Sequence, residues 1–168
     1  MEKKEFKQFF TEKMKALGFQ KKKDLYWKLL SDDYLIGLDI DPSSYCKGYQ
    51  IHCGMIYLPN ELKMPFRGCY DLDWNFRFPL SAGDEFDFDK IPFRCVFDYE
   101  LYSVQQLSEL FECNYARLIV PMYDQEYGLQ LMRNDWRLFR RHTNETIEAL
   151  CGRMNLDVRA VMAFLERT

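Results

Sequence analysis

The sequence predicts an α+β domain with an N-terminal helix, an antiparallel meander sheet of four to six strands and C-terminal helices packed on one face. Apolar residues recur with a helical period at the start, alternate with a period of two through the middle, and return to the helical period from Ser103. Hairpin-length connections between strands favour antiparallel pairing. With 168 residues, 48% of them hydrophobic, and no repeat or linker, we expect residues 1–168 to form a single domain.

The N-terminal helix is predicted from apolar residues at helical spacing. Phe6, Phe10, Met14 and Leu17 share one side, and lysines occupy the other side. Gly18 then ends the helix as a C-cap glycine does, because glycine adopts the left-handed backbone conformation without steric cost.

The predicted strands follow in sequence order. Alternating residues on either side of Ser31–Asp33 form a hairpin with a polar turn. A third strand runs to Tyr57, and DWNFRFP at 73–79 predicts a fourth. The stretch GDEFDFDK at 83–90 alternates acids with phenylalanines, so we expect a strand whose carboxylates face solvent, and Phe93 to Tyr99 extend the pattern.

Helices are predicted for the C-terminal part of the chain. Ser103 and Gln106 form a capping box, and Pro121 closes the helix that they begin. Further helical patterns cover Tyr127–Arg141, Ile147–Met154 and Asn155–Leu165.

Composition indicates the cellular compartment and the absence of membrane and cofactor partners that we expect for this chain. The chain starts without the apolar stretch of a signal peptide, and no apolar run is long enough to span a bilayer, so we expect a cytoplasmic protein without membrane contact. Six cysteines are scattered without zinc-site spacing, which favours reduced thiols. No cofactor motif is present, and we expect no cofactor.

Charge is distributed unevenly along the chain. Lysine and arginine outnumber acids by nine to four in residues 1–30, acids dominate residues 31–100 by thirteen to six, and the rest is balanced at eight to nine. Because affinity for nucleic acid comes largely from cations that neutralise phosphates, the acidic middle disfavours nucleic acid as a partner. We expect another protein or an acidic ligand instead.

One family resemblance lies in the first third of the chain. The residues GFQKKKDLYWKLLSDDYLIGLDIDPSS at 18–44, and YQIHCGMIY at 49–57, resemble the uncharacterised bacterial family catalogued as domain of unknown function 4304. VPMYD at 120–124 is similar to a helix-ending segment of that family. The resemblance implies an α+β fold and a bacterial cytosolic protein, and it brings no site residues.

The strongest candidate site is a stripe of arginines in RNDWRLFRRH. On a continuous helix these side chains would share one face, where guanidinium groups suit carboxylates and phosphates. The candidate contact residues are Arg133, Trp136, Arg137, Arg140 and Arg141. The alternative is that the arginines pair within the fold with Glu126, Asp135 or the acidic strand loops.

The enzyme alternative is a magnesium-dependent nuclease or phosphodiesterase. Asp41 is followed by Glu61 and Lys63, an E-x-K pair that such enzymes place beside an aspartate to bind Mg²⁺ and polarise water. A cysteine nucleophile is less favoured, because His52 and Cys53 are neighbours on a strand and point to opposite faces. We expect His52 on the sheet surface and Cys53 in the core.

These patterns lead to a functional expectation. We expect a non-enzymatic module that binds another protein, such as one that neutralises or senses it. Tyrosine, tryptophan, phenylalanine and arginine are enriched at protein interfaces, and this chain has 11 Tyr, 14 Phe and 3 Trp. A small-ligand pocket between sheet and helices stays open as a third possibility.

Overall fold

The structure is a computed structural model that describes residues 1–44, 46–57, 68–69, 72, 74–78 and 96–168. The strands are β1 (Gln20–Lys22), β2 (Leu25–Ser31), β3 (Tyr34–Pro42), β4 (Gly48–Tyr57), β5 (Trp74–Arg77) and β6 (Val96–Asp98). The helices are α1 (Lys3–Ala16), α2 (Val104–Asn114), η3 (Tyr115–Ile119), η4 (Val120–Tyr123), α3 (Gln125–Asn134), η5 (Trp136–Arg141), α4 (Asn144–Met154) and α5 (Val158–Arg167). This order confirms the predicted α+β class.

The sheet is the predicted antiparallel meander. Strands β1 to β5 lie in sequence order, and β6 pairs with the other end of β4. The turn after Ser31 joins β2 to β3 as predicted, and β3 pairs with β4 over nine residues from Tyr34 to Pro42. The acidic stretch 83–90 lies outside the described residues.

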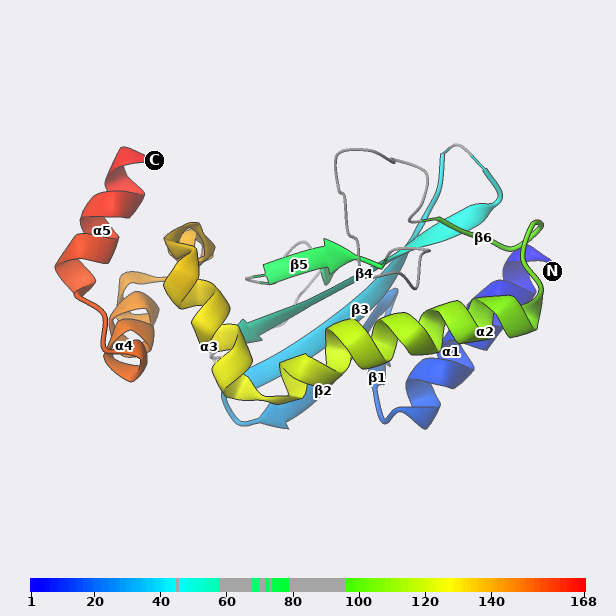
Figure 1. Cartoon of the computed structure of the whole chain (residues 1–168), viewed down its shortest axis with the longest axis horizontal. Helices are drawn as coiled ribbons and strands as arrows, with labels where there is room; N and C mark the ends of the chain where they lie inside the picture. Colours follow the sequence, from blue (N-terminus) through cyan, green and yellow to red (C-terminus); the bar gives the residue numbers. More distant parts are fainter. Residues whose placement is uncertain (45, 58–67, 70–71, 73, 79–95) are drawn as a thin grey trace.

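Helices cover one face of the sheet (Figure 1). Helices α1 and α2 lie side by side below it in this view, and α4 and α5 continue past its far end. The apolar face of α1 follows the prediction, since Phe6, Phe10 and Met14 are fully buried and Gly18 has a φ of +78°. Between the sheet and the helices lies one apolar core, to which buried residues from Phe6 to Val161 contribute. The sequence periodicity therefore located this layer correctly.

The second face of the sheet is also buried in its middle. Leu25, Leu35, Ile56, Cys69 and Leu72 form a second, smaller apolar cluster there. The expectation of a histidine on the sheet surface is therefore wrong, because Cys69 and Leu72 pack on this face and His52 is only 3% exposed. The expectation that Cys53 belongs to the core is confirmed.

The helix predicted over Tyr127–Arg141 is broken. Helix α3 ends at Asn134, and Asp135 is extended (φ −137°, ψ 93°) before the 3₁₀ helix η5 begins. The Asp135 carboxylate accepts a hydrogen bond from the backbone N–H of Arg137, so this aspartate caps a new helix. No helix among the described residues is both long and apolar enough to cross a bilayer.

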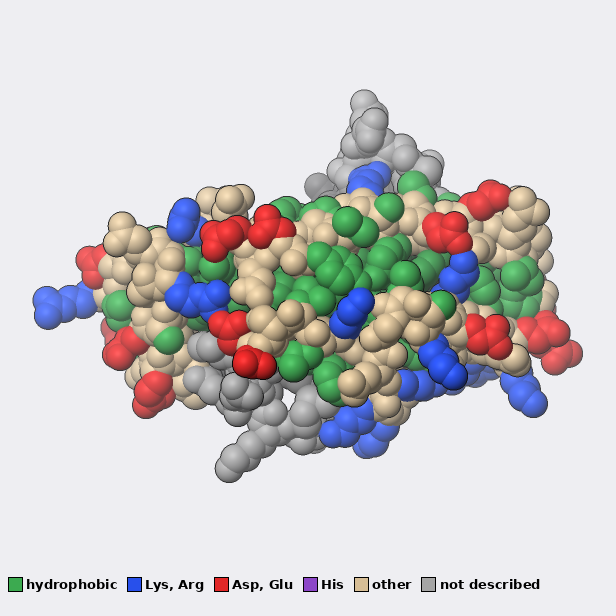
Figure 2. Space-filling view, turned by 90° about the horizontal axis from the view of Figure 1, so that it is seen from below, with side chains coloured by type: hydrophobic (Ala, Val, Ile, Leu, Met, Phe, Trp, Pro, Cys, Tyr) green, Lys and Arg blue, Asp and Glu red, His purple; other side chains and the backbone are tan. Residues whose placement is uncertain are grey.

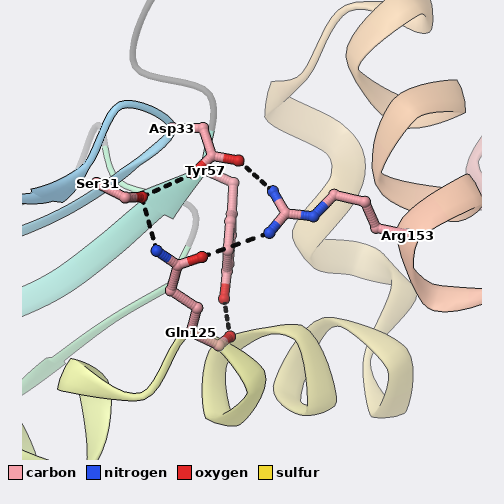
Figure 3. A network of polar contacts seen from close by, with 5 residues as sticks. All are labelled: Ser31, Asp33, Tyr57, Gln125 and Arg153. Carbon is pink, nitrogen blue, oxygen red and sulfur yellow. Dashed lines mark hydrogen bonds and ion pairs between the residues drawn. The ribbon is translucent and has the colours of Figure 1, made fainter.

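A closed polar network joins the C-terminal helices to the sheet (Figure 3). Arg153 of α4 binds Asp33 in the β2–β3 turn and lies 5.6 Å from the centre of the Tyr57 ring. Gln125 donates a hydrogen bond to Ser31 at 2.6 Å and accepts one from Tyr57 through its backbone carbonyl. The network links two strands to α3 and α4, so it fixes where these helices dock.

Candidate functional site

Lysines gather where α1 meets the edge strand β1. The apolar side of α1 is buried in the core, which leaves its polar side exposed beside β1. We call the exposed lysines at this place the lysine edge, and they are Lys7, Lys21, Lys22 and Lys23. Asp24 follows them as an exposed acid. Charged side chains on an edge strand also prevent unwanted strand pairing, which is their ordinary structural role.

Two of these lysines rest on aromatic rings. The Lys21 ammonium lies 5.0 Å from the centre of the Tyr26 ring and 3.4 Å from Thr11 Oγ1. The Lys7 ammonium lies 5.8 Å from the centre of the Tyr49 ring. Such cation–π contacts hold an ammonium without neutralising it. Within the described part of the chain, none of the four lysines has a carboxylate within 4.0 Å.

An open apolar pocket lies on the other side of α1 from the lysine edge. It lies between the C-terminal ends of α1 and α2 and has a volume of about 300 Å³. Its lining residues are Lys13, Ala16, Leu17, Phe111, Glu112 and Tyr115. Figure 2, which views the molecule from below, shows hydrophobic side chains in the middle of this face and cationic side chains along its lower edge.

Lys28 connects the pocket to the exposed aromatic surface beside it. Its ammonium donates to the carbonyl of Leu17 at 3.0 Å and lies 5.0 Å from the centre of the Tyr123 ring. The hydroxyl groups of Tyr123 and Tyr115 lie 2.6 Å apart and share a hydrogen bond. The Lys28 cation thus lies beside a pocket whose wall consists of rings, alkyl groups and the ion pair of Lys13 with Glu112.

The structure does not place the predicted arginines on one helical stripe. Because the helix breaks at Asp135, Arg133 belongs to α3 while Arg137 and Arg140 belong to η5, as does the backbone of Arg141. The alternative of pairing within the fold is confirmed for Arg137, whose guanidinium binds the Asp135 carboxylate through two 2.7 Å hydrogen bonds.

Two further members of the arginine segment also contact the fold. Arg133 donates to the carbonyl of Met154 at the end of α4 at 3.1 Å. Trp136 packs edge-on against Phe164 of α5 with ring centres 5.8 Å apart. Arg140 is exposed. A binding role for this segment stays a prediction.

A buried acid–histidine cluster lies on the second face of the sheet. Asp39 and His52 are cross-strand partners, and His52 Nδ1 lies 3.5 Å from both Asp39 Oδ1 and Asp41 Oδ2. Burial raises the pKa of Asp39 to about 6, although the Cys69 backbone N–H donates to its carboxylate at 2.6 Å. Burial also lowers the pKa of His52. Burial therefore favours the neutral form of both side chains.

The enzyme alternatives gain no support from this cluster. Glu61 and Lys63 lie outside the described residues, so the nuclease stays a prediction of which only Asp41 is described. Among the described residues, no group of three or more histidine, cysteine, aspartate or glutamate side chains is arranged to hold a metal ion. The Cys69 thiol is fully buried, and burial raises its pKa, so it is poorly suited to act as a nucleophile.

The sequence reasoning missed the lysine edge and the pocket. The excess of nine cations over four acids in residues 1–30 was the available signal for the lysines. The pocket had no such signal, because it depends on α1 and α2 lying side by side although about 90 residues of sequence separate them. Helical periodicity shows which side chains face a core, and it does not show which helices become neighbours.

Comparisons with known proteins give no further information about the site. No family model matches the chain, and neither a curated protein nor a solved structure is significantly similar to it. The resemblance of residues 18–57 to the family catalogued as domain of unknown function 4304 therefore stays a prediction.

Proposed function

We propose that this protein is a non-enzymatic binding module that recognises an acidic segment of another protein through the lysine edge. The observation that carries the proposal is the exposure of Lys7, Lys21, Lys22 and Lys23 without a carboxylate of the described chain within 4.0 Å. Unpaired cations that gather on one edge create a local positive potential, and such a potential steers an anionic partner into contact.

The balance of charge favours a protein over a nucleic acid. The chain carries a net charge of −3, and its excess of acids lies in residues 31–100. A long polyanion such as RNA would meet those acids once it extended beyond the lysine edge, whereas a short acidic segment contacts the lysines alone. Rim lysines of this kind mainly accelerate association, and salt screens their effect.

Charge reversal at the lysine edge tests the proposal. We expect the double substitution Lys7→Glu with Lys21→Glu to weaken binding of a labelled polyglutamate peptide at least about tenfold, because two attractive contacts become repulsive. Fluorescence anisotropy at low salt measures the dissociation constant, and added salt should weaken wild-type binding. Arg159→Glu with Arg167→Glu is the matched control, since it changes net charge equally on exposed positions of α5.

Two outcomes would overturn the proposal. Equal loss of binding in both double variants would mean that net charge decides affinity and that the lysine edge is not a site. Loss of binding in Arg137→Glu with Arg141→Glu, together with unchanged binding after lysine reversal, would place the contact at η5 as the sequence predicted. An RNA oligonucleotide of similar charge that binds more tightly than polyglutamate would contradict the choice of partner.

A further inference from the structure

We infer that the pocket between α1 and α2 receives one apolar side chain of an acidic partner segment, whose carboxylates lie on Lys28 beside the pocket and, across α1, on the lysine edge. This inference rests on the proposed function and specifies its ligand: an acidic peptide with a phenylalanine or leucine anchor. The position of Lys28 beside the pocket formed by Leu17, Phe111 and Tyr115 carries it, with the lysine edge on the other side of α1.

The pocket has the chemistry of an anchor site. Its volume of about 300 Å³ accommodates a large apolar side chain, and the rings of Phe111 and Tyr115 and the alkyl groups of Ala16 and Leu17 form most of its wall. Burial raises the pKa of the Tyr115 phenol, and the Tyr123 hydroxyl adds to this effect, so this wall stays uncharged. Interface energy is concentrated where an aromatic or aliphatic anchor enters such a pocket.

Charges around the pocket favour an acidic partner. Its one carboxylate, Glu112, is bound by Lys13 and accepts from Ser108 at 3.0 Å, and these contacts lower the pKa of Glu112. Lys28 remains as a cation at the edge, with a carbonyl and aromatic rings as its partners. Thr11, which contacts Lys21, lies five to six residues before Ala16 and Leu17, which is about 8 Å along α1 and about 120 to 140° around it. A peptide anchored in the pocket therefore crosses the exposed side of α1 to reach Lys21, and the helix width of about 10 Å takes about three extended residues at about 3.3 Å each.

The wall of the pocket ends in an unusual helix. Helix α2 passes at Tyr115 into the five-residue π-helix η3, and π-helical turns are found frequently at functional sites. The chain then turns through η4, where Val120 is 49% exposed and Tyr123 is 36% exposed. Tyr123, whose hydroxyl bonds to that of Tyr115 in the pocket wall, provides further contact area for a bound peptide.

Filling the pocket tests the inference. The probes are three labelled peptides: one with a single phenylalanine flanked by glutamates, one with alanine in its place, and one with glutamines in place of the glutamates. We expect wild-type protein to bind the phenylalanine peptide at least about tenfold more tightly than the alanine peptide. Ala16→Leu should remove this preference while the charge-dependent binding remains.

The control is Ala160→Leu, which adds the same side chain at an exposed position on α5 and should leave the preference intact. Both positions are exposed and helical, and leucine is a good helix former, so both variants should keep the wild-type melting temperature. A preference for phenylalanine that survives Ala16→Leu overturns the anchor pocket and leaves the proposed function standing. Equal affinity of the glutamate and glutamine peptides overturns the proposed function, and the acidic ligand with it.

Discussion

Replacing Asp39 with asparagine is expected to stabilise the protein by about 3 kcal/mol at neutral pH and to change its stability little near pH 4. Asp39 is 4% exposed, and burial raises the pKa of its carboxyl from 3.8 to about 6, with a smaller contribution from the nearby Asp41 charge. One pKa unit corresponds to about 1.4 kcal/mol, so a rise from 3.8 to about 6 means that ionising Asp39 lowers the stability of the folded state by about 3 kcal/mol.

The sign follows from proton linkage. The folded state holds the Asp39 proton more tightly than the unfolded state does, because its carboxyl pKa is raised. The resulting stability is fully present below pH 3.8, the ordinary value, and is lost as the pH rises through about 6. Asparagine carries no charge at either pH, and its amide oxygen can still accept the hydrogen bond from the Cys69 backbone N–H.

Urea unfolding of both proteins, at about pH 4 and about pH 7.5, measures the difference. Asp39→Ala is the control, since it removes the acceptor for the Cys69 N–H and leaves a gap. It should therefore be less stable than Asp39→Asn at both pH values, and less stable than wild type near pH 4, where the wild-type carboxyl is mostly protonated. The account is wrong if Asp39→Asn is less stable than wild type at pH 7.5, because the ionised carboxylate would then gain more from its hydrogen bond than it loses by burial.

The layers of the fold were predictable because each periodic segment carries its own evidence. Alternation in β3 and β4 located the core face, and the Ser103–Gln106 capping box marked the start of α2. The second buried face was not predictable, because Asp39 and His52 look like solvent-facing positions on an alternating strand. Their burial depends on Gly68 and Cys69, which reach them from a distant part of the sequence.

The arginine segment shows the opposite limit. The helix predicted from Tyr127 to Arg141 did not take into account that Asp135 can cap a new helix. The Asp135 carboxylate accepts a hydrogen bond from the Arg137 backbone N–H, and the new helix that begins there separates Arg133 from the later arginines. The same aspartate then binds the Arg137 side chain. A side chain that hydrogen-bonds to a nearby backbone N–H can end a helix even where the apolar spacing continues. The spacing alone does not show that this happens.

Replacing Phe10 with alanine is expected to destabilise the protein by about 3 to 5 kcal/mol, the usual cost of removing a buried phenyl ring. Phe10 is fully buried, and its ring meets Tyr26 of β2 at 5.2 Å and Phe111 of α2 at 5.8 Å, both edge-on. It therefore joins α1 to the sheet and to the neighbouring helix. Urea unfolding should show a lower midpoint with an unchanged slope.

Phe9 provides the matched control, because it is the next residue on the same helix and is only partly buried. Phe9→Ala should cost about 1 kcal/mol or less, and equal losses in the two variants would show that Phe10 does not hold α1 in place. Phe111 is both the ring against which Phe10 packs and a wall of the anchor pocket. Phe10→Ala should therefore lower stability and peptide binding together, whereas Ala16→Leu should lower binding alone.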